Sequence, residues 1–110
     1  MKYRNHILLI FLFLSILNFK SISQNNKIDA LKRELSTPNL GDSIRLDILC
    51  NLCWELVVMD ALKVKDYENE LKTLEDRVFG IKGYFKVKIV LGYYYYKGTG
   101  NLDLALQYFL

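Results

Sequence analysis

The segment from residue 91 to residue 109 constrains the fold of this chain more than any other stretch. It reads Leu-Gly-x-x-Tyr, then a glycine-rich turn, then Ala-x-x-x-Phe. In helices, Gly92 and Tyr95 lie on neighbouring turns, and Ala105 and Phe109 lie one turn apart on the next helix. A small residue on each helix lets the two backbones approach closely, and the aromatic beside it fills the remaining space. The segment therefore predicts a tightly packed helix–turn–helix.

Apolar residues recur at steps of three and four along most of the chain, which is the spacing of amphipathic helices. The first such helix follows a polar stretch expected to be frayed (24–27) and ends before Pro38, because the residue preceding a proline is pushed out of the helical region. The expected helices cover residues 28–35, 43–58, 60–78 and 84–97, and a fifth begins near residue 102. Their expected N-caps are Asp42 or Ser43 for the second helix, Asp60 for the third and Asn101 for the fifth.

Residues 87–96 leave a choice, because they are rich in Val, Ile and Tyr, which also suit a β-strand. The helical segments on both sides and the Leu-Gly-x-x-Tyr spacing favour a helix. Gly80 and Gly83 bracket the turn that precedes it. The fold class predicted is all-α.

The later helix pair has an upstream counterpart, since Leu52-Cys53-x-x-Leu56 corresponds to Leu91-Gly92-x-x-Tyr95. This pattern resembles a tetratricopeptide repeat (TPR), a helix–turn–helix unit of about 34 residues. The resemblance covers residues 43–110 and implies antiparallel helix pairs of an α-solenoid. About one and a half repeats, the second incomplete, would follow a lead-in helix and loop (24–42). The residues it implies for packing between helices are Leu52, Cys53, Leu56, Leu91, Gly92, Tyr95, Ala105 and Phe109.

TPR units bind extended peptides in a groove lined by the first helix of each pair, so the resemblance implies a protein or peptide partner. Aromatic side chains with a polar handle and cations suit that role. Packing remains the alternative for the four consecutive tyrosines that begin at Tyr93, and a core position remains the alternative for Trp54. The groove positions implied are Asp47, Cys50, Trp54, Val57 and Val58 in the earlier unit and Lys86, Ile89, Tyr93, Tyr96 and Lys97 in the later one.

The layout also resembles the exported N-terminal TPR arrays of Bacteroidetes-type signalling proteins. In those proteins, a transmembrane helix and a histidine kinase or DNA-binding module can follow the repeats. The resemblance implies the sensor or docking end of such a protein, as a fragment or truncated relative. Because solenoid repeats bury their apolar faces only against neighbours, we expect residues 24–110 alone to be marginally stable or to associate with themselves or a partner.

The first 23 residues have the three parts of a signal peptide. Lys2 and Arg4 form the basic region, an apolar run covers residues 7–17, and Ser21 and Ser23 provide the small residues of a cleavage site. Cleavage before residue 24 would export the protein to the periplasm or the medium. The alternative is an uncleaved N-terminal anchor, and only then would the protein be held at a membrane.

The leader also accounts for the basic balance of the chain. The chain has 15 Lys and Arg and 12 Asp and Glu, and three of the basic residues but none of the acidic ones lie in residues 1–23. Residues 24–110 are therefore formally neutral. A nucleic-acid binder carries a surplus of clustered Lys and Arg, so no nucleic-acid partner is expected.

Chemistry-bearing residues are sparse. The single histidine, His6, lies in the leader, which removes Ser-His-Asp and Cys-His catalysis from the mature chain. Cys50 and Cys53 form a C-x-x-C inside a helical run, for which packing, an incidental disulfide and a small thiol-redox protein are alternatives. Two cysteines without further ligands do not make a zinc site, and no metal or cofactor is expected. The hypothesis from sequence is a non-catalytic interaction module, with a redox protein or a truncated product without independent function as rivals.

Overall fold

The computed structural model describes residues 6–7 and 24–110, and within them every regular element is a helix. The all-α prediction is thereby confirmed, and the β-strand considered for residues 87–96 is wrong. Apart from residues 6–7, the expected leader lies outside the described residues. The elements are a helix over residues 24–35, α2 (Asp42–Asp60), the 3-10 helix η1 (Ala61–Tyr67), α3 (Glu68–Phe79), the 3-10 turn η2 (Gly80–Lys82), α4 (Phe85–Tyr93), the π-helix η3 (Tyr94–Thr99) and α5 (Leu102–Phe109).

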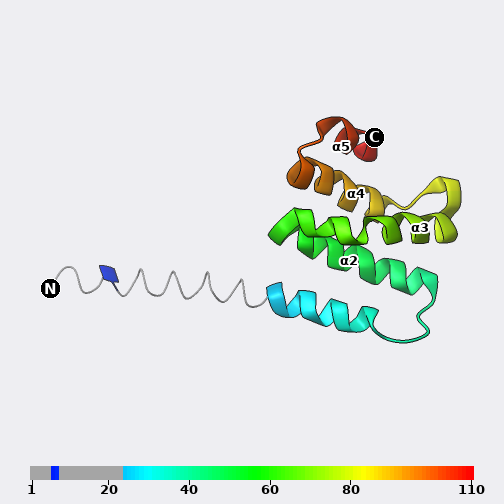
Figure 1. The fold of residues 1–110 in the computed structure, drawn as a ribbon, viewed down its shortest axis with the longest axis horizontal. Helices are drawn as coiled ribbons and strands as arrows, with labels where there is room; N and C mark the ends of the chain where they lie inside the picture. The colour runs from blue at the N-terminus through cyan, green and yellow to red at the C-terminus, as the bar shows by residue number, and fades with distance from the viewer. Residues whose placement is uncertain (1–5, 8–23) are drawn as a thin grey trace.

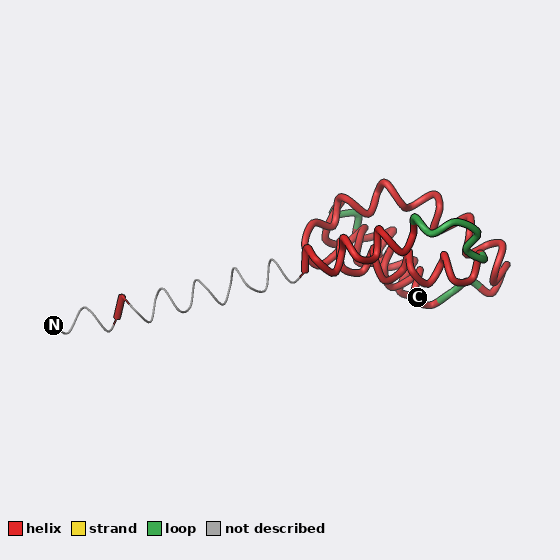
Figure 2. The backbone as a smooth tube through the Cα atoms, turned by 90° about the horizontal axis from the view of Figure 1, so that it is seen from below, coloured by secondary structure: helices red, strands yellow, loops and turns green. Residues whose placement is uncertain are grey.

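Successive helices reverse direction along the described part of the chain (Figure 1). Helix 24–35, drawn in cyan, runs beside α2, and α2 contacts η1, α3 and α4. Helix α4 in turn contacts α3 and α5. Short loops join the helices, as Figure 2 shows. Helix α2 is thus the central element, with neighbours on several sides.

The core is built around α2 because this helix is apolar on most of its circumference. Leu46, Leu49, Leu52 and Cys53 are fully buried. Residues from α3 and α4 complete the core, since Leu71 and Leu91 are also fully buried. The outer helices contribute far less, with Ala105 as the buried residue of α5.

The start of α2 differs from the expected cap. Its N-cap is Gly41, whose backbone is extended (φ −65°, ψ 152°), and no side chain accepts a capping hydrogen bond there. The expected caps at Asp42 or Ser43 are therefore wrong. Asp42 lies instead in the first turn, where its negative charge interacts favourably with the helix dipole.

The helix expected over residues 60–78 is divided in the structure. Residues 61–67 form a 3-10 helix, α3 begins at Glu68, and Asp60 makes no side-chain capping bond. In a 3-10 helix, residues three apart share one face, which brings Val64 and Tyr67 toward the core; Val64 is fully buried. The three-residue step in this segment fits 3-10 geometry as well as the α-helix that we expected.

The helix expected over residues 84–97 also changes geometry, because α4 ends at Tyr93 and the next turn is π-helical. Tyr94 and Tyr95 of this π turn are both buried. A Cβ on Gly98 would lie 3.4 Å from the backbone carbon of Ala61, so the π segment packs closely against the start of η1. This tertiary contact involves residues far apart in the sequence.

Other local predictions agree with the structure. The Asn101 side chain caps α5 by accepting a hydrogen bond from Leu104 N at 3.1 Å. Gly80 and Gly83 bracket the turn before α4 with φ values of +62° and +66°, a region that glycine enters without steric cost.

The first helix likewise ends before Pro38 as expected, at residue 35. Residues 24–27, however, are helical rather than frayed. Lys27 Nζ lies 2.9 Å from Glu55 Oε1 on α2, and this ion pair helps to hold the start of the described helix.

Candidate functional site

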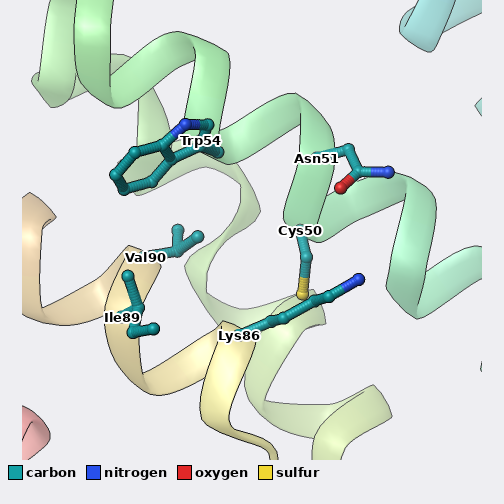
Figure 3. A pocket seen from close by; sticks show the side chains of 6 residues that line it. All are labelled: Cys50, Asn51, Trp54, Lys86, Ile89 and Val90. Atoms are coloured by element: carbon teal, nitrogen blue, oxygen red, sulfur yellow. The ribbon is translucent and has the colours of Figure 1, made fainter.

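A largely apolar pocket of about 330 Å³ lies between α2 and α4. Figure 3 shows the indole of Trp54 above Ile89 and Val90, with the Cys50 sulfur beside the stem of Lys86. The spacing explains the arrangement, because positions three or four apart share one helix face. Helix α2 contributes Cys50, Asn51 and Trp54, and α4 contributes Lys86, Ile89 and Val90.

Trp54 is the largest side chain of this pocket and is 41% exposed. Its ring meets Tyr93 edge-on, with centroids 5.6 Å apart and planes at 77°. Tyr93 in turn meets Phe109 of α5 edge-on at 5.2 Å. Such pairs add stability beyond the buried area. Tyr93 therefore supports the indole from one side and connects the pocket to α5, while part of Trp54 stays open to solvent.

The charge at the mouth of the pocket is largely balanced. Tyr84 Oη donates a hydrogen bond to Asp47 Oδ1 at 2.8 Å, and Lys86 Nζ lies 4.0 Å from the same oxygen. The Lys86 ammonium also lies 5.9 Å from the centre of the Tyr84 ring. Asp47 does not line the pocket itself but contacts Lys86, which does. The apolar surface rather than a net charge therefore dominates this site.

The two cysteines are buried and carry free thiols. Burial raises the pKa of Cys50 and of Cys53 to about 12 each. The thiolate is the reactive form of cysteine, so both thiols are protonated and unreactive near neutral pH. These values argue for packing over the redox alternative.

A second pocket, of about 550 Å³, lies on the other side of α2, against the helix of residues 24–35. Asn51 and Trp54 line both pockets. The second pocket is more polar, because two carboxylates and an ammonium border it. Its lining residues are Lys27, Ala30, Leu31, Glu34, Asn51, Trp54 and Glu55.

The structure does not bring all expected groove residues together. Val57 is 3% exposed and belongs to the core. The groove position expected for Val57 is therefore wrong. Tyr96 and Lys97 are exposed beyond the lining of the first pocket, and Lys97 Nζ lies 5.9 Å from the centre of the Tyr93 ring. Val58 is exposed and lines neither pocket.

Sequence reasoning missed Asn51, Val90 and the contribution of helix 24–35. Asn51 lies three residues before Trp54, and this spacing alone could have assigned it to the same face. The contribution of residues 24–35 had no such local signal, because it depends on how that helix packs on α2.

The residues expected to pack between helices lie at the helix contacts. A Cβ on Gly92 would lie 2.5 Å from Cε1 of Phe109, so the Phe109 ring occupies the space that a side chain would need. Phe109 itself is 46% exposed on its other side. Apart from Phe109, all the residues expected to pack between helices are buried: Leu52, Cys53, Leu56, Leu91, Gly92, Tyr95 and Ala105.

Within residues 6–7 and 24–110, no group of three or more His, Cys, Asp or Glu side chains is arranged to hold a metal ion. In the same part of the chain, no helix combines the length and apolar character needed to cross a membrane. No family model, curated protein or solved structure matches the chain.

Proposed function

We propose that this protein is a binding module of the TPR type that holds an extended peptide segment of another protein between α2 and α4. The observation that carries the proposal is the apolar pocket in which Trp54 of one helix faces Ile89 and Val90 of the other. These helices are the first members of the two helix pairs. Four of the residues that the TPR resemblance assigned to a groove line this pocket: Cys50, Trp54, Lys86 and Ile89.

The physical character of the pocket supports binding over catalysis. Its floor is apolar, and Trp54 offers a large, partly exposed ring held by Tyr93. Burying such a ring against a partner side chain is a common source of binding energy. The Asn51 amide at the rim can both donate and accept hydrogen bonds, which suits the backbone of an extended peptide.

We also propose that the protein acts outside the cytoplasm, because residues 1–23 read as a signal peptide. For the binding test, the protein is therefore purified from the cells that naturally produce it, so that any cleavage has already taken place. Its intact mass is measured first. A mass lower than that of the unprocessed protein by the mass of residues 1–23 is expected. An unprocessed mass would contradict export by cleavage.

The binding test selects peptides from a displayed random library and measures their affinity through the emission of Trp54, the single tryptophan of the chain. The variant Ile89→Glu places a charge in the pocket and is expected to weaken the selected peptides at least about tenfold. The matched control is Ile81→Glu, because Ile81 is fully exposed on the turn before α4.

The two variants separate the pocket from general effects of an added charge. Circular dichroism checks that both keep their helices. Equal affinity of the selected peptides for the parent and for a folded Ile89→Glu protein would refute binding in this pocket.

A further inference from the structure

The two pockets on either side of α2 form one surface with Trp54 at its centre. Asn51 and Trp54 lie three residues apart on α2 and line both pockets. A peptide that crosses the indole would therefore enter both. The chemistry of the second pocket then determines which partner sequence fits.

The second pocket carries a net negative charge. Glu34 and Glu55 border it, against the single ammonium of Lys27. Lys27 is already paired with Glu55 at 2.9 Å. Glu34 is exposed and forms no ion pair among the described residues. Its carboxylate is therefore the free charge of this pocket.

Trp54 adds a second, independent attraction for a cation. Trp54 is 41% exposed and lines both pockets, and the face of an indole is the best cation–π acceptor among side chains. Tyr93 packs against it edge-on. A guanidinium or ammonium group in the second pocket would thus meet both a carboxylate and an aromatic ring.

Building on the proposed function, we propose that the bound segment carries an apolar side chain for the pocket between α2 and α4 and an Arg or Lys side chain for the pocket between residues 24–35 and α2. The spacing follows from helix packing. Neighbouring helix axes lie about 8–10 Å apart, and an extended chain advances about 3.3 Å per residue. The two anchors are therefore two or three residues apart in the partner.

The test uses short blocked peptides of Gly and Ser that contain one Phe and, two or three positions away on either side, Arg, Gln or Glu. Binding to the same processed protein is followed through Trp54 emission, at peptide concentrations up to about 1 mM, near the weak end of measurable affinity. The Arg peptide with the better spacing is expected to bind about five- to thirtyfold more tightly than its Glu counterpart, because an exposed ion pair and a cation–π contact each contribute modestly.

Charge variants on one helix provide the control. Glu34→Gln is expected to reduce the Arg preference several-fold, and Glu34→Lys to reverse it in favour of the Glu peptide. Asp29→Asn removes the same charge from the same helix, but Asp29 borders a different pocket, beside Ile28 and Lys32. It is expected to leave the preference unchanged.

The outcomes distinguish this inference from the proposed function. Equal binding of the Arg and Glu peptides, or an Arg preference that survives Glu34→Gln, overturns the cationic anchor and leaves peptide binding at α2 and α4 intact. Failure of every peptide, including those selected from the library, to bind the folded protein overturns both.

Discussion

At the scale of single residues, Gly92 is the position where one methyl group would disturb the contact of two helices. A Cβ there would lie 2.5 Å from Cε1 of Phe109 and 2.8 Å from Cδ1 and Cζ. Real Cβ atoms do not approach other atoms so closely, so the ring would have to move. Phe109 is partly exposed and can rotate outward, at the expense of its contact with Tyr93.

We expect Gly92→Ala to lower the free energy of unfolding by about 1 kcal/mol, because overpacking costs about 1–3 kcal/mol and the better helix propensity of Ala offsets about 1 kcal/mol of it. In a Phe109→Ala background the clash is absent, and the same change should stabilise the protein by about 1 kcal/mol. Urea unfolding measures both differences. The same sign in both backgrounds would contradict the close approach.

Single residues also show how far sequence reasoning reaches. The contact of Gly92 with Phe109 could be expected, because a small residue on one helix and an aromatic at helical spacing on the next are typical of a close helix contact. The groove position of Val57 was wrong. Helix α2 is apolar nearly all round, so its pattern does not separate the side that faces the core from the side that faces the pocket.

At the scale of elements, Glu68 joins α3 to η3. Glu68 lies in the first turn of α3 and accepts hydrogen bonds from Tyr95 Oη and from Lys72 Nζ, the latter at 2.9 Å. Lys72 Nζ also lies 5.9 Å from the centre of the Tyr108 ring, and Tyr108 stacks on Tyr95. The Glu68 carboxylate therefore joins α3 to η3, and Tyr108 of α5 packs on the two side chains that donate to it.

This carboxylate makes stability depend on pH. Burial alone would raise the pKa of Glu68, but the hydrogen bonds from Tyr95 and Lys72 outweigh burial and lower it. A lowered folded-state pKa contributes stability above the unfolded value of about 4.3, and that contribution is lost as the pH falls through the folded-state pKa. Burial and the bond to Glu68 raise the pKa of Tyr95 to about 12, so Tyr95 remains a donor near neutral pH.

We expect Glu68→Gln to lower the free energy of unfolding by about 1 kcal/mol at pH 7, since a partly exposed charged hydrogen bond contributes modestly. The difference from the parent protein should shrink as the pH falls below about 4.3 and the parent carboxylate becomes protonated. Urea unfolding across this pH range tests the sign. Tyr95→Phe, which removes one donor to Glu68 with little change of shape, should reduce the same pH dependence. A difference in free energy of unfolding between the parent and Glu68→Gln that stays constant across this pH range would refute the role of this carboxylate.

The existence and order of the helices could be predicted, because their apolar spacing is local. The local geometry of η1 and η3 could not. Both depart from α-helical form where Gly98 approaches Ala61, and the long separation of these two residues along the chain hides that contact from any local pattern. The second pocket was missed for the same reason, since it depends on how residues 24–35 dock on α2.

At the scale of the whole molecule, α2 contributes the largest number of buried residues, whereas residues 24–35 and α5 contribute one each, Ile28 and Ala105. Residues 24–35 and α5 lie at opposite ends of the row of helices (Figure 1). Arg45 ties residues 24–35 to the centre, because its Nη1 donates to Leu35 O at 3.1 Å while Nε donates to Glu70 of α3. Phe109 ties α5 to the centre through Gly92 and Tyr93.

Helices that are held mainly by their neighbours should open separately, as in repeat proteins. We expect amide hydrogen exchange to be slowest in α2 and faster in residues 24–35 and α5. Arg45→Gln should lower the opening free energy of residues 24–35 by about 1 kcal/mol, because it removes two partly exposed charged hydrogen bonds, and should leave α5 unchanged. Phe109→Ala should lower the opening free energy of α5 and leave that of residues 24–35 unchanged. If both variants instead lowered protection equally in all helices, the chain would open as one cooperative unit. Residues 24–35, which border the second pocket, could then not open without α5.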